Sequence, residues 1–279
     1  EATKFAAEWQ VVAQKPNTTT GFSGTLFKNK QTGELVLSFR STEFVDDAIR
    51  DSAATNTLEV FKAGWAFGQL SDMEAWYAAL KTKGDIPAGA RLSVTGYSLG
   101  GHLATAFNLL HQSELNGGQV VTFNGAGVGK LNAGQTLQGV LNYFNALRAD
   151  PGQIKSTLGL TLDGLSGFYD TLRQNLGNGT WTAAQAKAEL AAQRMTYSES
   201  DRILFDGQTF AIDKALNDIL SLQAEAERIK SFTSGGDRDK PLQPVAAVQI
   251  LAQTIDYRLA VDLASQRTSS ELSVFSKTP

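Results

Sequence analysis

The fold is decided by residues 91–105, whose sequence is RLSVTGYSLGGHLAT. The first half alternates apolar with polar or β-branched residues, as a short buried strand does. The second half continues as an Ala- and Leu-rich run typical of a helix. Between the two lies Gly96-Tyr97-Ser98-Leu99-Gly100, a Gly-x-Ser-x-Gly motif. A strand before the motif and a helix after it are the context in which a nucleophilic serine occurs.

This motif predicts a nucleophile at Ser98. A tight strand-to-helix turn strains the backbone of its central residue and exposes the side chain, and Gly96 and Gly100 allow the flanking backbones to approach closely. The amide of Leu99, at the start of the helix, would point toward an oxygen that gains negative charge. The alternative is a chance glycine-serine pattern, which the strand and helix on either side make less favourable.

Composition limits the other functions. The 279 residues carry a formal net charge of −3, with 42% hydrophobic and 19% charged residues. This is enough for one large α/β domain with an insertion. There is no basic excess, so we expect no nucleic-acid partner. No apolar run approaches the roughly 20 residues that span a bilayer, and the lack of cysteine excludes disulfides and thiolate chemistry.

Strand and helix patterns alternate around the motif, which predicts a mostly parallel sheet. Phe5, Trp9 and Val12 have helical spacing and predict a helix over 2–14. The remaining expected elements are a hairpin of strands over 21–29 and 34–39, a helix that begins at a capping box at Ser71, and a strand over 119–123.

The glycine-rich segment after that last strand, residues 124–130, does not indicate a nucleotide site. A phosphate loop needs glycine where Asn124 stands and Ser or Thr where Leu131 stands, and the glycine spacing does not fit a dinucleotide fingerprint. We therefore expect a tight loop and no cofactor. Asp237 and Asp239 could contact a cation, but a solvated loop is the favoured interpretation, so no metal site is predicted.

A helical insertion or cap is expected over about 131–193, within a single domain that spans 1–279. This stretch is rich in Gly, Asn, Gln, Leu and Ala, with helices expected at 141–147, 164–176 and 183–192. Residues 194–198 are predicted to return to the sheet as a strand. Two long amphipathic helices, over 210–229 and 245–263, complete the expected chain.

Three blocks together resemble the class 3 lipases of the α/β-hydrolase superfamily, in a bacterial form. They are the segments 39–43 (FRSTE), 96–104 (GYSLGGHLA) and 121–129 (VTFNGAGVG). The resemblance implies hydrolysis of acylglycerols, phospholipids or simpler esters through a serine acyl-enzyme. It assigns Thr42 to the oxyanion hole and places Ser41 where the family usually has glycine. It also implies a lipid or small ester substrate, transient contact with a lipid surface, and a lid formed by 43–57 or by the inserted helices.

A serine nucleophile needs a histidine to take its proton and a carboxylate to orient that histidine. The chain order in this fold is Ser, then acid, then His. We predict Asp201 as the acid because a strand is expected before it, with Asp150 and Asp206 as rivals. The two histidines, His102 and His111, both precede these acids. His102 lies one turn after Ser98 on a helix that runs away from the site, so we expect both to be structural.

The missing base leaves three explanations. The histidine lies outside these 279 residues, which begin with Glu1 and are expected to be a processed form or a piece of a longer protein. Alternatively, the chain is a catalytically silent lipase-like module that binds a lipid or a protein, or another group serves as the base. The primary prediction is a carboxylic-ester hydrolase. The absence of cysteine and the bacterial form of the motifs favour a secreted protein.

Overall fold

The structure is a computed structural model that describes residues 2–41, 58–232 and 254–273. The chain divides into two compact units. The sheet unit comprises residues 1–141 and 267–279, and the helical unit comprises Asn142–Gln266. Ser98 and Leu99 belong to the first unit, whereas Asp150, Asp201 and Asp206 belong to the second. Thr42 and the expected lid at 43–57 lie outside the described residues.

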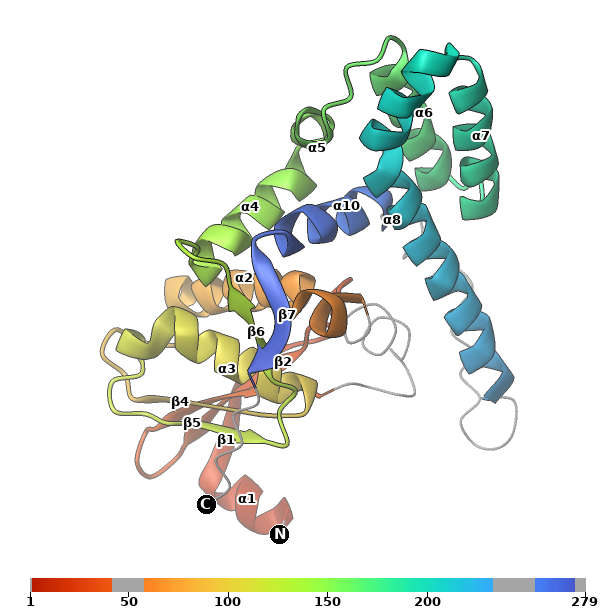
Figure 1. The fold of residues 1–279 in the computed structure, drawn as a ribbon. Helices are drawn as coiled ribbons and strands as arrows, with labels where there is room; N and C mark the ends of the chain where they lie inside the picture. The colour runs from red at the N-terminus through yellow and green to blue at the C-terminus, as the bar shows by residue number, and fades with distance from the viewer. Residues whose placement is uncertain (1, 42–57, 233–253, 274–279) are drawn as a thin grey trace. The chain divides into compact units, whose positions relative to one another are not determined.

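The sheet unit is built on a five-stranded sheet of order β1-β2-β3-β4-β5 (Figure 1). β1 and β2 are antiparallel, as are β2 and β3, while β3, β4 and β5 are parallel, so four of the five strands run in the same direction. This confirms the predicted α/β class. The strands are β1 (Trp9–Lys15), β2 (Gly24–Asn29), β3 (Leu35–Phe39), β4 (Leu92–Tyr97) and β5 (Val120–Phe123).

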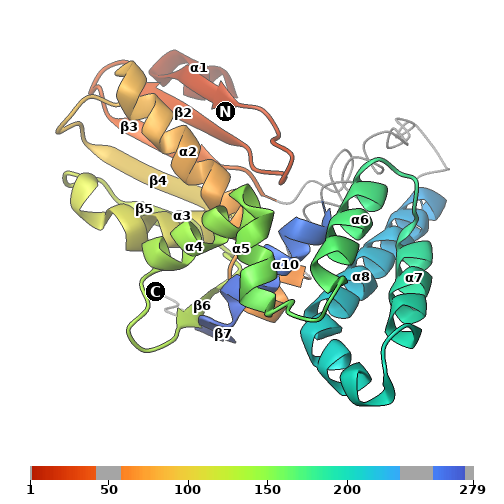
Figure 2. The ribbon, with the colours of Figure 1, turned by 90° about the horizontal axis from the view of Figure 1, so that it is seen from above.

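One face of this sheet is covered by two helices. α2 (Phe67–Lys83) connects β3 to β4, and α3 (Leu99–His111) connects β4 to β5, with the short 3₁₀ turn η2 (Gln112–Glu114) after it. The two crossovers move along the sheet in the same direction, and right-handed crossovers of this kind place their helices on the same face. Figure 2 shows α2 and α3 together on that face. Leu26, Leu37, Leu92 and Val94 are buried beneath them.

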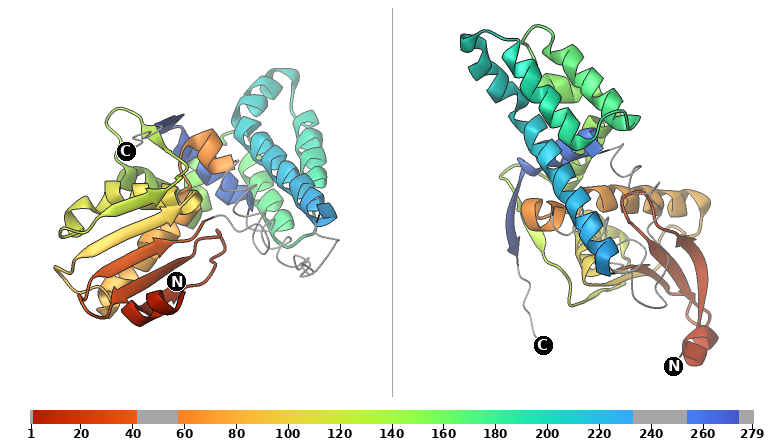
Figure 3. Two further views of the ribbon diagram at one scale, coloured as in Figure 1. Left: turned by 90° about the horizontal axis from the view of Figure 1, so that it is seen from below. Right: turned by 90° about the vertical axis from the view of Figure 1, so that its right-hand side faces the viewer.

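The opposite face of the sheet is far more open. Figure 3 (left) shows the strands toward the viewer, with α2 and α3 behind them and α1 (Ala2–Glu8) beside β1. Phe5 of α1 packs edge-on against Phe27 of β2, with 5.4 Å between the ring centroids. At the other end of the sheet, Tyr97 and Phe123 are 55% and 59% exposed. The helix expected over 2–14 is therefore wrong beyond Glu8, since β1 pairs with β2 instead.

The sheet unit also contains a second, smaller sheet and the start of a helix that continues into the helical unit. β6 (Val128–Leu131) pairs with β7 (Thr268–Ser273) in a separate antiparallel sheet. α4 (Leu137–Ala149) crosses the boundary between the units. The Thr268 hydroxyl donates to the Ala63 carbonyl across 2.9 Å, which fixes β7 against the segment before α2.

The described part of the helical unit is built from helices. These are α5 (Pro151–Leu158), α6 (Leu165–Gly177), α7 (Ala183–Met195), α8 (Glu199–Phe232) and α10 (Thr254–Ser265). Tyr169 and Arg173 of α6 both donate to the Asp256 carboxylate of α10, at 2.6 and 2.7 Å. A capping box of Thr182 and Gln185 begins α7. The unit runs to Gln266, well past the expected cap boundary at about 193.

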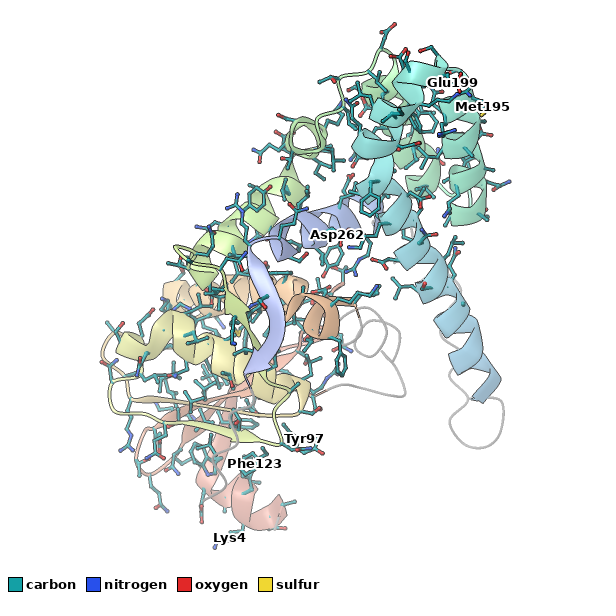
Figure 4. All side chains as sticks on the ribbon, in the orientation of Figure 1. Lys4, Tyr97, Phe123, Met195, Glu199 and Asp262 are labelled. Carbon is teal, nitrogen blue, oxygen red and sulfur yellow. The ribbon has the colours of Figure 1, made fainter. Side chains whose placement is uncertain are left out.

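Two further sequence predictions are corrected. No strand forms at 194–198, where α7 ends at Met195 and α8 begins at Glu199 (Figure 4). The helix expected to begin at a capping box at Ser71 instead begins at Phe67, with Ser71 buried inside it and no side-chain cap at Ala66. Both errors come from local sequence signals that tertiary packing overrides.

Candidate functional site

Ser98 is the single residue between β4, which ends at Tyr97, and α3, which begins at Leu99. Its backbone has φ +52° and ψ −116°, a conformation that L-residues rarely adopt. Such strain costs about 1–3 kcal/mol and persists only where the surroundings impose it. The sharp strand-to-helix turn predicted for the nucleophile is therefore present.

Close packing of glycines imposes this turn. A Cβ atom on Gly96 would lie 2.1 Å from the Gly100 carbonyl oxygen, and one on Gly100 would lie 2.3 Å from the Phe39 carbonyl oxygen. A Cβ on Gly101 would lie 2.7 Å from the Gly125 Cα. Real Cβ atoms do not come this close to backbone atoms, so each glycine of the motif is required by its neighbours.

Hydrogen bonds tie the Ser98 backbone to the end of β5. The Ser98 N–H donates to the Phe123 carbonyl, and the Ala126 N–H donates to the Ser98 carbonyl, each at 3.0 Å. Gly101 and His102 also donate to the Ser98 carbonyl, at 3.0 and 3.1 Å. Loop 124–127 therefore wraps the turn from one side, while the end of β3 packs against Gly100 from the other.

The Ser98 hydroxyl and the Leu99 N–H form no hydrogen bond within the described part of the chain. The Ser98 side chain makes no hydrogen bond there and is half-buried. The N–H of Leu99, the first residue of α3, donates to no described atom either. A free N–H at a helix start carries partial positive charge and suits an anionic oxygen. The arrangement can present a hydroxyl and stabilise an oxyanion beside it.

His102 is fixed in a structural role. It is fully buried; its Nδ1 donates to the Gly127 carbonyl at 2.8 Å, and its Nε2 accepts from the Ala66 N–H at 3.2 Å. Burial lowers the pKa of His102, which keeps the ring neutral. Both ring nitrogens are used to join α3 to the segment before α2 and to the loop after β5, so neither can take a proton from Ser98.

His111 is also fully engaged, at the far end of α3. Its Nε2 lies 2.7 Å from Glu74 Oε1, and its Nδ1 lies 2.7 Å from Glu114 Oε1. Tyr77 and Lys81 of α2 both donate to Glu114 Oε2, at 3.0 and 2.8 Å.

The carboxylates decide the protonation of this cluster. Burial works to lower the pKa of His111, but the hydrogen bonds and negative charges of Glu74 and Glu114 outweigh it and raise that pKa. Burial opposes the ionised form of Glu114, yet the donors Lys81, His111 and Tyr77 lower its pKa to about 2. This cluster was missed by the sequence reasoning, although Glu74, Tyr77 and Lys81 have the spacing of one helical stripe.

The three candidate acids all serve the ends or flanks of helices. Asp201 lies exposed in the first turn of α8, where its Oδ2 accepts from the Ser198 hydroxyl at 2.5 Å. Asp150 caps α5 by accepting from the Gly152 N–H at 2.8 Å. Asp206 pairs with Arg194 of α7 at 2.6 Å, and this hydrogen bond lowers the pKa of Asp206.

These positions remove the reason for choosing Asp201, which was the strand expected just before it. The assignment of Asp201 as the acid stays a prediction, and so does that of Thr42 as an oxyanion residue. Within the described ranges, no group of three or more histidine, aspartate or glutamate side chains is placed to hold a metal ion. No described helix combines the length and the apolar character needed to cross a bilayer.

Comparison of the chain with protein-family models, curated proteins and solved structures found no match.

Proposed function

We propose that this chain is a carboxylic-ester hydrolase of lipase or esterase type, with Ser98 as its nucleophile in an α/β-hydrolase-type sheet unit. The observation that carries the proposal is the strained backbone of Ser98, whose glycine neighbours leave no room for a Cβ. A structure tends to retain strain of this kind where function requires it. The resemblance of the three sequence blocks to class 3 lipases supports the same activity.

In this proposal the Ser98 oxygen attacks the acyl carbon of an ester. The Leu99 N–H stabilises the negative charge that develops on the carbonyl oxygen, and Thr42 supplies the second donor. One oxyanion donor is worth roughly 2.7–4 kcal/mol in the transition state. The acyl group passes to Ser98 as the alcohol leaves, and water then releases the acid. The substrates proposed are acylglycerols, phospholipids or simpler esters.

The proton of Ser98 needs a base that the two histidines do not supply, because each ring is held by two partners. An elbow serine that lacks one triad member still retains about 10³–10⁴ of rate acceleration over water, from oxyanion stabilisation and binding. We therefore expect slow but real acylation of Ser98 in this chain.

The test is covalent labelling with a fluorophosphonate probe, followed by peptide mapping. Labelling is expected at Ser98, is expected to vanish in Ser98→Ala, and is expected to persist in the matched control Ser198→Ala, which removes an exposed hydroxyl from the helical unit. Native protein that labels no faster than urea-denatured protein would refute the hydrolase proposal.

A second candidate function is a catalytically silent lipase-like module that binds a lipid or a protein. The engagement of both histidine rings favours it. A chain of this kind would bind a non-hydrolysable acyl ether, measured by calorimetry, while Ser98 stays unlabelled. Binding without labelling would replace the first proposal with this one.

A further inference from the structure

The two edges of the sheet differ in how well they are protected. The β1 edge has an irregularity in its pairing between Val11 and Ala13, ends at Lys15, and has α1 against it. Bulges, lysines and covering helices are the usual means by which proteins prevent edge strands from pairing with other chains.

The four residues of β5 include no lysine, and its pairing with β4 has no bulge. Within the described part of the chain, β5 pairs only with β4. The thirteen residues from Gly117 to Gly129 contain no charge and no proline. Val121 and Phe123 are 44% and 59% exposed, and Tyr97, which pairs with Phe123, extends the apolar surface onto β4 (Figure 4). A bare apolar edge of this kind is a template for another strand.

The hydrogen bonds of β5 show which backbone groups are open. Val94 and Ser98 donate to the carbonyls of Gln119 and Phe123, so the odd-numbered residues turn their backbone groups toward β4. Successive residues of a strand alternate in this respect. The N–H and C=O groups of Val120 and Thr122 therefore point away from the sheet, toward the open edge.

These groups are self-complementary about Val121. We propose that β5 pairs antiparallel with β5 of a second copy of this chain, across a two-fold axis at Val121. Val120 of each copy then exchanges two hydrogen bonds with Thr122 of the other, and Val121 lies directly opposite itself. Because the edge carries no charge, two identical strands can meet without like-charge repulsion. This favours a second copy of the chain as the partner.

The size of this contact sets its strength. Each copy contributes a strand of four residues and three exposed apolar side chains. The area buried on each partner is therefore smaller than that of a standard interface, which is about 800 Å². We expect a weak dimer that forms and dissociates with concentration. This inference does not depend on the proposed hydrolase activity.

The test uses charges placed on the two-fold axis, with sedimentation velocity as the readout. In Val121→Lys or Val121→Glu, two like charges lie opposite each other, and each variant alone is expected to dimerise at least tenfold more weakly. An equal mixture of the two variants is expected to recover the dimer, because lysine then faces glutamate. The matched control is Val11→Lys on the other edge strand, where Val11 is 59% exposed, and it should dimerise normally.

Three results would overturn the proposal. One is a wild-type chain that stays monomeric up to about 100 μM, which would leave the edge to a strand from a different polypeptide. A dimer that Val121→Lys does not weaken would move the interface elsewhere. Failure of the lysine and glutamate variants to associate with each other, while circular dichroism shows both folded, would exclude the two-fold pairing at Val121.

Discussion

Replacing Ser98 by glycine is expected to stabilise the protein relative to Ser98→Ala, although both variants lose the nucleophile. The φ of +52° and ψ of −116° cost a non-glycine residue about 1–3 kcal/mol. Glycine adopts this backbone without strain. However, glycine also raises the conformational entropy of the unfolded chain, which lowers the stability of the folded state by about 0.4–1 kcal/mol. The balance predicts that Ser98→Gly is more stable than Ser98→Ala by about 0.5–2 kcal/mol.

Urea unfolding, followed by the fluorescence of Trp65 and Trp76 in the sheet unit, measures this difference. The control pair is Gln112→Gly and Gln112→Ala, because Gln112 is exposed and has an ordinary φ of −51°. There glycine is expected to be the less stable variant, by about 0.5–1 kcal/mol. If Ser98→Gly proved less stable than Ser98→Ala by as much as in the Gln112 pair, the turn would hold no strain, and the main support for a nucleophile at this position would be lost.

Three other perturbations address the same unit. Gly100→Ala puts a Cβ 2.3 Å from the Phe39 carbonyl, so urea unfolding should show a loss of about 1–3 kcal/mol together with loss of probe labelling; a fully stable, labelled variant would contradict the packing argument. The raised pKa of His111 beside Glu74 means that its charge stabilises the folded state fully below the unfolded pKa of about 6.5. The stability advantage of wild type over His111→Gln should therefore shrink as the pH rises through the folded pKa, and an advantage that grows with pH would refute this sign. Imidazole on the order of 0.1 M should accelerate labelling of Ser98 by up to about tenfold, measured by gel fluorescence with the non-basic isostere thiazole as control, and equal rates with both compounds would show that no base is lacking.

The turn at Ser98 could be predicted from sequence because its signature is contiguous in the chain. A buried strand, a Gly-x-Ser-x-Gly motif and a helix follow one another without interruption, and each glycine contacts a backbone atom close to the motif or at a neighbouring strand end. The structural role of His102 was also predictable, since one helical turn carries it away from the serine.

Other predictions failed where long-range pairing overrides local pattern. Phe5, Trp9 and Val12 share a helical face, yet the residues from Trp9 onward pair with β2, because the register Val11 to Phe27 provides a partner that no local pattern reveals. The segment 194–198 looked like a strand because of its Thr and Tyr, but it only joins two helices. The assignment of Asp201 as the acid depends on that strand, so it loses its support together with the strand.

The open edge at β5 and the missing base have a common origin in the path of the chain. After β5, the next strand, β6, pairs with β7 in a separate sheet, and most of the described chain between these two strands is helical. Within the described residues, the sheet therefore gains no strand beyond β5 that could carry an acid or a histidine at its carboxyl end beside Ser98. A second copy paired at β5 would cover the edge but would not complete the triad, because its His102 and His111 are held by two partners each, as in the first copy. Pairing at the β5 edge and proton transfer at Ser98 are thus independent, and the Val121 variants test only the pairing.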